Sequence, residues 1–372
     1  MATKARLDSI DFWRGIVLCT IFIDHLPGNL FESLTPRNYG FSDAAEAFVF
    51  LSGVSLALAY GTRFESGDKG PILQALARRC LKLYGVHIGL SLLAIAIFAA
   101  GAAWGHDPAL LTAHGRDLII NEPVEGTLGL ILLGHQIGYF NILPLYLVLM
   151  AFVPLLLWLA TIDRRLMLAF SLTLYLATRL GQWNLPSWPL PGVWFFDPLA
   201  WQLVMAIGLA IGLGVKAGDT IPRSRPLIAI AGTIVLFGAV VVTNGLGLWP
   251  GLRDSVQNWA DLDKMHLGVG RVVHFIALAY LVYALRWAQA LHAWRGYSLL
   301  ALLGRNSLWV FALVSILTAI GQVLMESLRH TAVFDLMFIV GGLVAIYAAT
   351  SLIDVKPGAI LPRRQTEPGL PA

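Results

Sequence analysis

The most constraining feature of this 372-residue sequence is a succession of apolar segments that runs from end to end. A helix that crosses the hydrocarbon core of a membrane needs about 20 predominantly apolar residues. Only 13% of the residues are charged, whereas soluble domains carry about 25%. The pattern predicts an all-α integral membrane protein, a polytopic bundle of about ten transmembrane helices, at residues 10–26, 44–61, 83–103, 136–160, 166–182, 198–215, 227–244, 269–287, 306–324 and 334–353.

The segments between these spans are short and polar, and they begin at Pro, Gly and charge clusters such as PGNLFESLTPRN and KAGDTIPRSRP. None is long enough to hold a separate soluble domain. We therefore expect one membrane-embedded domain over residues 1–372, with a cytoplasmic tail at 354–372. No small-residue cleavage site follows the first apolar run, so we expect a retained first helix rather than a signal peptide.

The basic residues predict the orientation, because cytoplasmic loops of membrane proteins are enriched in Lys and Arg. With the N-terminus in the cytoplasm, most of the 26 Lys and Arg residues fall in cytoplasmic segments. The opposite segments hold only Arg37, Arg116, Arg253, Lys264 and Arg329. The asymmetry predicts that both termini are cytoplasmic.

Cysteine content and net charge exclude some classes of protein. Cys19 lies within a predicted span and Cys80 beside a basic loop, so neither a disulfide framework nor a metal-ligand spacing is expected. The net charge of +4 is small and spread over many loops, which argues against nucleic-acid binding.

The first span, DFWRGIVLCTIFIDH, carries four ionisable residues. At about 100° per residue, Asp11, Arg14 and His25 share one helical face, whereas Asp24 points about 100° away from His25. Ionisable groups within spans are costly and usually face a protein interior or a water-filled cavity. The alternatives are that Arg14 anchors the helix at the interface and that His25 is an interfacial residue at a helix end.

His25 is the best general-base candidate, because its ordinary pKa lies near physiological pH. Asp24 could stabilise the charged imidazole only if the helix is irregular there, which Pro27 permits. The sequence has no G-x-S-x-G motif and no plausible nucleophilic cysteine, which favours direct transfer over a covalent acyl-enzyme.

Two predicted outer segments are rich in His and carboxylate side chains. They suit a hydroxylic or sugar-like substrate, although they are equally typical of solvated loops. The segment 104–135 carries His106, His114, Asp117, Glu122, Glu125 and His135, and the segment 245–268 carries Asp254, Asp261, Asp263 and His266.

The motif SDAAEAFVFLSG begins the second span. Asp43 and Glu46 have the spacing of a helix-capping box. The alternative is that Glu46 faces the same cavity as His25. Ser52 and Gly53 would let another helix or a cofactor approach the backbone closely.

The motif KMHLGVGRVVHFIALAYL places Arg271 and His274 on one face at the start of the eighth span. A buried Arg271 could bind a carboxylate, and the alternative is an interfacial arginine.

The motif FFDPLAWQL predicts a helix start, with Asp197 as cap and Pro198 at the first helical position. Two alternatives are open for Trp201 and Gln202: they line a site, or they belong to the interfacial belt. The motif LLGRNSLWVF places Arg305 at the cytoplasmic start of the ninth span.

Taken in order, DFWRGIVL, SDAAEAFVFLSG, NILPLYLVL, FFDPLAWQL, LGVGRVVHFIALAYL and LGRNSLWVF resemble the OpgC family within the transmembrane acyltransferase-three superfamily. The resemblance covers roughly residues 8 to 320. One departure is Asp197, where the family pattern leads us to expect Asn before the proline. The resemblance implies an acyl-CoA-dependent O-acyltransferase of the bacterial inner membrane that adds succinyl groups to osmoregulated periplasmic glucans.

The resemblance also implies residue roles. Acyl-CoA, preferably succinyl-CoA, would dock from the cytoplasm as co-substrate, and no metal is expected. His25 would deprotonate a glucan hydroxyl, with Glu46 and Asp24 as catalytic partners. Basic residues would draw the CoA phosphates, and other side chains would hold the acyl group and acceptor. The donor set is Arg14 with its neighbour Asp11, Arg78, Arg79 and Arg305; the substrate set is Arg271, His274, Trp201, Gln202 and Ser52.

Three alternatives remain at this point. The protein could transfer acetyl to another cell-envelope polysaccharide, or transport an acylated or sugar substrate. It could also be a membrane scaffold without catalytic activity. The sequence leaves open the oligomeric state and whether the acyl group is transferred directly or through an acyl-His intermediate.

Overall fold

The computed structural model describes residues 2–67, 69–257, 259–328 and 331–354, and all its regular elements there are helical apart from one isolated bridge between Pro186 and Val193. In chain order the helices are α1 (Ala2–Asp24), α2 (Ala44–Glu65), α3 (Lys69–Gly105), α4 (Ala109–Thr112), α5 (Leu118–Asn121), α6 (Pro123–Ile131), α7 (Ile142–Ile162), α8 (Arg164–Gly181), α9 (Pro198–Ala217), α10 (Arg225–Val242), α11 (Leu252–Gln257), α12 (Val269–Ala284), α13 (Trp287–Ala290), α14 (Arg295–Arg305), α15 (Ser307–Ser327) and α16 (Ala332–Asp354). Short 3₁₀ turns lie at Glu32–Leu34, Pro36–Asn38, Ala113–Gly115 and Gly138–Phe140.

Each of the ten predicted spans falls on a helix. Within the described residues, seven helical segments are long and apolar enough to cross a membrane, so the protein is a multi-pass membrane protein. These are α2, α3, α7 with the turn before it, α9, α10, α15 and α16. The other three predicted spans lie on α1, on the amphipathic α8 and on the shorter apolar α12.

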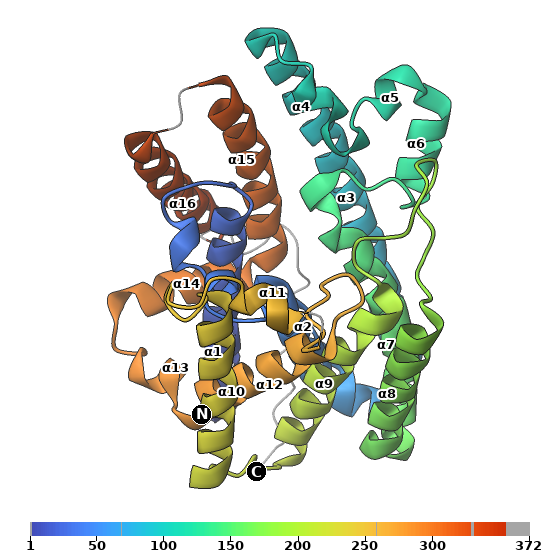
Figure 1. Ribbon diagram of the computed structural model, residues 1–372. Helices are drawn as coiled ribbons and strands as arrows, with labels where there is room; N and C mark the ends of the chain where they lie inside the picture. The colour runs from blue at the N-terminus through green and yellow to red at the C-terminus, as the bar shows by residue number, and fades with distance from the viewer. Residues whose placement is uncertain (1, 68, 258, 329–330, 355–372) are drawn as a thin grey trace.

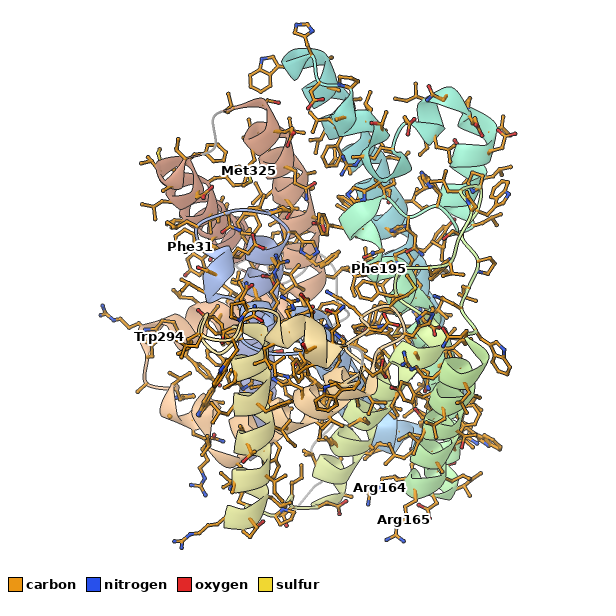
Figure 2. All side chains as sticks on the ribbon, viewed as in Figure 1. Phe31, Arg164, Arg165, Phe195, Trp294 and Met325 are labelled. Carbon is orange, nitrogen blue, oxygen red and sulfur yellow. The ribbon has the colours of Figure 1, made fainter. Side chains whose placement is uncertain are left out.

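In Figure 1, α3 to α8 occupy one side of the view and α1, α10 and α12 to α16 the other, with α2 and α9 between them. The short helices α4, α5 and α6 form one end of the molecule. Arg164 and Arg165, at the start of α8, lie at the opposite end (Figure 2). We call the end formed by the short helices the α4–α6 end and the opposite end the Arg164 end.

Helices α2 and α9 pack closely because glycines face the partner backbone. A Cβ atom on Gly53 would collide with the carbonyl of Met205, and one on Gly208 would collide with that of Phe50. Small residues allow such contacts between membrane helices. The predicted close approach at Ser52–Gly53 is therefore confirmed, and the partner is a helix.

Helices α1 and α14 make a second close crossing, in which Gly15 lies against the Leu300 carbonyl and Gly304 against the Asp11 carbonyl. Arg305, at the end of α14, lies 3.8 Å from Asp354, the last residue of α16. The first half of α1 and the end of α16 therefore lie at the same end of the bundle.

Side-chain caps fix where the helices around the cavity begin. Asp43 caps α2 in a complete capping box with Glu46, as the spacing predicted. Asp197 caps α9 by accepting the Leu199 backbone N–H, and Pro198 occupies the first turn. Both caps lie next to the segment 261–268, which leads into α12.

Candidate functional site

A cavity of about 700 Å³ lies where α1 ends and α2 begins. Its other walls come from segments 114–115, 134–142 and 187–196, which connect the helices of the α4–α6 side. Phe195 of the last segment lies centrally in Figure 2, between the two sides of the bundle. Polar side chains lie among apolar ones on its walls; the polar ones include Asp24, His25, Arg37, His135, Tyr139 and Lys264.

His25 has one ring nitrogen fixed and the other open. Its Nδ1–H donates to the Ile21 carbonyl at 2.6 Å, and no described residue hydrogen-bonds to Nε2. The bond at Nδ1 leaves a lone pair on Nε2, which is the arrangement that a general base requires. The Tyr139 ring stands edge-on to the imidazole at a centroid distance of 4.6 Å. Gln322 donates to the His25 carbonyl at 2.8 Å and so ties this end of α1 to α15.

Asp24 is directed to Arg37 rather than to the imidazole next to it. Its Oδ1 lies 3.7 Å from Arg37 Nε, and Arg37 Nη1–H also donates to the Asp24 carbonyl at 3.3 Å. Arg37 forms a further ion pair with Glu32. Asp24 lines the cavity, but its contacts hold the turn Pro36–Asn38 against α1.

Glu46 is fully buried and both of its oxygens are engaged. Oε2 accepts the Asp43 backbone N–H at 2.9 Å, and Oε1 accepts Arg271 Nε–H at 2.7 Å. Arg271 Nη2 lies 3.2 Å from Asp43 Oδ2 as well. The described contacts of Glu46 and Arg271 are thus with each other and with Asp43, and neither residue lines the cavity.

Lys264 lines the cavity and is joined to Glu46 and Arg271 through Asp43. Its Nζ donates to Asp43 Oδ2 at 2.6 Å. Although burial alone would raise the pKa of Asp43, Lys264 and Arg271 together hold that pKa below its ordinary value. Asp43 is therefore an anion that joins two cations, and only Lys264 of the two lines the cavity.

Trp201 holds the backbone that carries Lys264. Its indole Nε1–H lies 3.2 Å from both the Lys264 and Met265 carbonyls, and the Asp197 backbone N–H donates to Met265 at 3.0 Å. Trp201 is completely buried and does not line the cavity. It therefore supports the site rather than facing a ligand.

Three other predicted substrate residues also lie outside the cavity lining. Gln202 is completely buried, accepts the Ser171 hydroxyl at 2.6 Å and thereby joins α9 to α8. Ser52 donates to the Phe48 carbonyl at 2.8 Å. His274 lies 2.8 Å from the Ser42 hydroxyl, through Nδ1. The Gln202 and His274 contacts join separate parts of the chain, whereas the Ser52 contact lies within α2.

The predicted donor-binding residues lie toward the opposite end of α1. Arg14 lies 3.7 Å from Asp11 and interacts electrostatically with Arg79 and Tyr146. Arg79 donates to the Tyr146 hydroxyl at 3.3 Å. The fold therefore brings α1, α3 and α7 together around two arginines.

Arg305 and Arg78 are more exposed than Arg14. Arg305 interacts electrostatically with Asp11, and its guanidinium lies 3.8 Å from Asp354. Arg78 donates only to the Gln74 carbonyl, at 3.3 Å, on its own helix. Arg305 thus joins the Asp11–Arg14 region, whereas no described contact joins Arg78 to it.

Aromatic rings connect the two regions. Phe311 lines the cavity, its ring centroid is 6.1 Å from that of Phe48, and Phe48 is 6.0 Å from Tyr146. Tyr146 in turn receives the Arg79 hydrogen bond. A continuous contact path therefore joins the His25 cavity to the arginines.

The sequence did not single out Tyr139, Arg37 or Lys264 as site residues, although all three line the cavity. They lie in loops, where no helical periodicity reports a common face. Two features of the sequence could have pointed to Lys264 and Arg37. Lys264 is the first residue of the motif that contains Arg271, and both residues are cations in outer segments that contain few cations. Among the described residues no group of three or more His, Cys, Asp or Glu could hold a metal ion, and Cys19 and Cys80 are both free.

These features define a multi-pass helical membrane protein with a cavity that His25 and several other polar side chains line. Residues 6–356 match the family described as OpgC protein, and the chain belongs to that family. Membership gives it a role in the modification of osmoregulated periplasmic glucans and an acyltransferase type of activity. Neither the curated proteins nor the solved structures contain a significant match.

Proposed function

We propose that this protein is a membrane O-acyltransferase that moves an acyl group, preferably succinyl, from cytoplasmic acyl-CoA to hydroxyls of a periplasmic glucan. The observation that carries the proposal is His25, whose Nδ1 is bound to Ile21 and whose Nε2 is open at a polar cavity. The same helix carries Arg14 roughly 16 Å away, because eleven residues rise about 1.5 Å each. One helix thus links an anion-binding region to a base.

The proposed orientation puts the Arg164 end in the cytoplasm of a Gram-negative bacterium and the α4–α6 end in the periplasm. The positive-inside rule supports it, since Arg164 and Arg165 lie at that end and belong to the set of segments that holds most of the Lys and Arg residues. The inner membrane is then the site of action, and both termini are cytoplasmic. The cavity faces the compartment that holds the glucan.

The donor would bind with its phosphates at Arg14 and Arg79. Arg14 interacts with the Asp11 carboxylate and also with Arg79, so an added anion is attracted to the two arginines. Arg305 and the exposed Arg78 would add to the positive electrostatic potential that attracts the phosphates of the donor. The acyl-pantetheine arm would follow the path past Phe48 and Phe311 to His25.

The chemical step follows from the ring geometry of His25. Nε2 removes the proton of a glucan hydroxyl as the oxygen attacks the thioester carbonyl carbon. The C–S bond then breaks, and the leaving thiolate takes the proton from the imidazolium. An ester and free CoA result, and His25 returns to its starting state. Nδ1 keeps its bond to the Ile21 carbonyl throughout and stabilises the charged ring.

A succinyl group needs a cation for its free carboxylate, and Lys264 is our candidate. The ammonium has three N–H donors and gives one to Asp43 in the described structure. Arg271 and Glu46 support it from behind by fixing Asp43. This places the predicted carboxylate contact on Lys264 instead of Arg271.

The experiment is acyl transfer by purified full-length protein in detergent, with succinyl-CoA or acetyl-CoA and unsubstituted periplasmic glucan. Mass spectrometry of the glucan distinguishes the two acyl groups by their mass increments. We expect His25→Ala to lower the rate about 10²–10⁴-fold, the usual contribution of a general base. His106→Ala is the matched control, since this outer histidine does not line the cavity.

Two results would contradict the proposal. Full transfer by a correctly inserted His25→Ala protein would remove His25 as the base. Movement of glucan or acyl-glucan across proteoliposomes without any covalent product would support a transporter instead. Transfer of acetyl in strong preference to succinyl would keep the enzyme class and change the donor.

A further inference from the structure

A second histidine, His135, lines the same cavity as His25. His135 is only 2% exposed, yet it is among the residues that line the cavity. Its ring makes a backbone hydrogen bond at Gly115, whereas Nε2 has no partner among the described residues. A buried ring nitrogen without a partner is unusual, because buried polar atoms are normally hydrogen-bonded.

The bond at one nitrogen determines what the other can do. A neutral imidazole that donates to a backbone carbonyl through Nδ1 leaves Nε2 as an acceptor. Burial lowers the pKa of His135, so the neutral ring is the form present at neutral pH. His25 has the same arrangement. Both histidines line the cavity, and each has a ring nitrogen without a described partner, so a ligand that supplies two hydrogen-bond donors would match them.

The backbone around His135 is fixed without a ligand. The His135 N–H donates to the Gly129 carbonyl at 2.9 Å, and the Gly134 carbonyl accepts the Trp188 N–H at 3.3 Å. The loop 187–196 thus braces the segment that carries His135. A fixed acceptor loses little entropy when a ligand binds, so it is suited to orienting one.

Tyr139 lines the same cavity and lies four residues after His135 in the chain. Its ring centroid is 4.6 Å from that of His25 and 6.2 Å from that of His114. The side chain remains 38% exposed. It therefore offers an aromatic surface beside the base, and the C–H face of a pyranose ring is a suitable partner for it.

We infer that His135 Nε2 accepts a hydroxyl hydrogen of the acceptor sugar while His25 takes the proton of the reacting hydroxyl, with Tyr139 against the sugar face. The inference rests on the proposed function and assigns the acceptor subsite. A sugar held only at His25 can turn and present different hydroxyls. A second contact fixes the ring, so His135 determines acceptor affinity and which hydroxyl is acylated.

The test compares His135→Ala, His135→Gln and His106→Ala in the purified full-length enzyme, with unsubstituted glucan as acceptor. Gln places an amide oxygen close to the position of Nε2 and keeps the acceptor. We expect His135→Ala to raise the KM for glucan about tenfold, the effect of losing one hydrogen bond of ordinary strength. It should leave the KM for acyl-CoA unchanged and spread the acyl groups over more ring positions, as NMR of the product would show.

His135→Gln should recover most of the glucan affinity and the original positional pattern, and His106→Ala should match the parent protein. An unchanged glucan KM with an unchanged pattern in His135→Ala would overturn the inference. So would a parallel rise in both KM values, or equal defects in Ala and Gln variants together with a lower melting temperature, since either indicates a structural role.

The failure of this inference is distinguishable from failure of the proposed function. Acyl-CoA-dependent transfer that requires His25 establishes the function whatever His135 does. If transfer survives His25→Ala, His25 is not the base. The role of His135 in acceptor binding is then tested by the glucan KM of its variants alone.

Discussion

The two ends of α1 differ in how their ionisable residues are held. Arg14 lies among packed helices, near Asp11, Arg79 and Tyr146. His25 lies among loops that come from four parts of the chain. The first environment depends on helix packing and the second on loop conformation, although one helix connects them.

The balance of charge also differs. Near Arg14 the cations outnumber the nearby carboxylates, which suits a polyanionic ligand. Around the cavity each cation has a carboxylate partner, as Lys264 has Asp43 and Arg37 has Glu32. This suits a neutral, hydroxyl-rich ligand with at most one further negative charge. The difference teaches that one helix can carry two regions of different charge balance, as the proposed binding of a polyanionic donor and a neutral acceptor requires.

The largest effect after loss of His25 is expected from Arg14→Ala. Removal of one charge-assisted phosphate contact should raise the KM for acyl-CoA about 10–100-fold while the glucan KM stays constant. Steady-state kinetics at two salt concentrations measures it, because added salt should weaken the parent protein more than the variant. Arg295→Ala, an exposed arginine at the start of α14, is the control. A rise in the glucan KM would show that the two ends are not independent.

A smaller effect is expected from Lys264→Met, which keeps the chain length and removes the charge. If Lys264 binds the succinyl carboxylate, the ratio of kcat/KM for succinyl-CoA over acetyl-CoA should fall about tenfold. Competition between the two donors, read by mass spectrometry of the glucan, gives this ratio directly. Arg253→Ala is the control, since Arg253 is exposed and outside the cavity lining. An unchanged ratio would place acyl selection elsewhere.

The smallest effect concerns Asp197, which caps α9 next to the segment that carries Lys264. Burial raises the pKa of Asp197 to about 6, despite the Leu199 N–H bond that favours the anion. Because the folded pKa lies above the unfolded one, the stabilising contribution is full below about pH 4 and is lost as the pH rises through about 6. Asp197→Asn keeps the cap and removes the ionisation.

The variant should therefore be more stable than the parent protein at pH 7.5, on the order of 1–3 kcal/mol, and equal to it near pH 4. Thermal melts in detergent across this pH range measure the difference. A variant that is less stable at pH 7.5 would show that the carboxylate itself is needed there, for example toward His266 or Arg179, which favour its charged form.

The helices were largely predictable from the sequence, because each must hide its backbone polar groups and present apolar side chains over a whole span. The capping residues also predicted helix starts correctly. Helix α2 begins after Asp43, with Glu46 in its capping box, and α9 begins after Asp197, with Pro198 in its first turn. The number of membrane spans was less predictable from the sequence. Hydropathy alone does not establish α1, α8 and α12 as spans, since their polar residues and length differ from those of the other seven.

The candidate site was predictable only along α1. Helical geometry places Asp11, Arg14 and His25 on one face, and the structure has Asp11 beside Arg14 and His25 at the cavity. The same reasoning failed to separate Arg271 and Trp201, which support the site, from Lys264, which lines it. A buried arginine looks the same in sequence whether its partner is a ligand or, as here, Glu46.

The sequence by itself determined the class of protein, the positions of its helices and the placement of Arg14 and His25 on one face of α1. These features depend on local periodicity and on the free-energy cost of placing polar groups in lipid. Only the tertiary structure decided that His135, Tyr139 and Lys264 line one cavity with His25, while Glu46 and Arg271 pair with each other outside its lining. The reason is that these contacts join loops and helix ends far apart in the chain, and their distances follow from packing rather than from spacing.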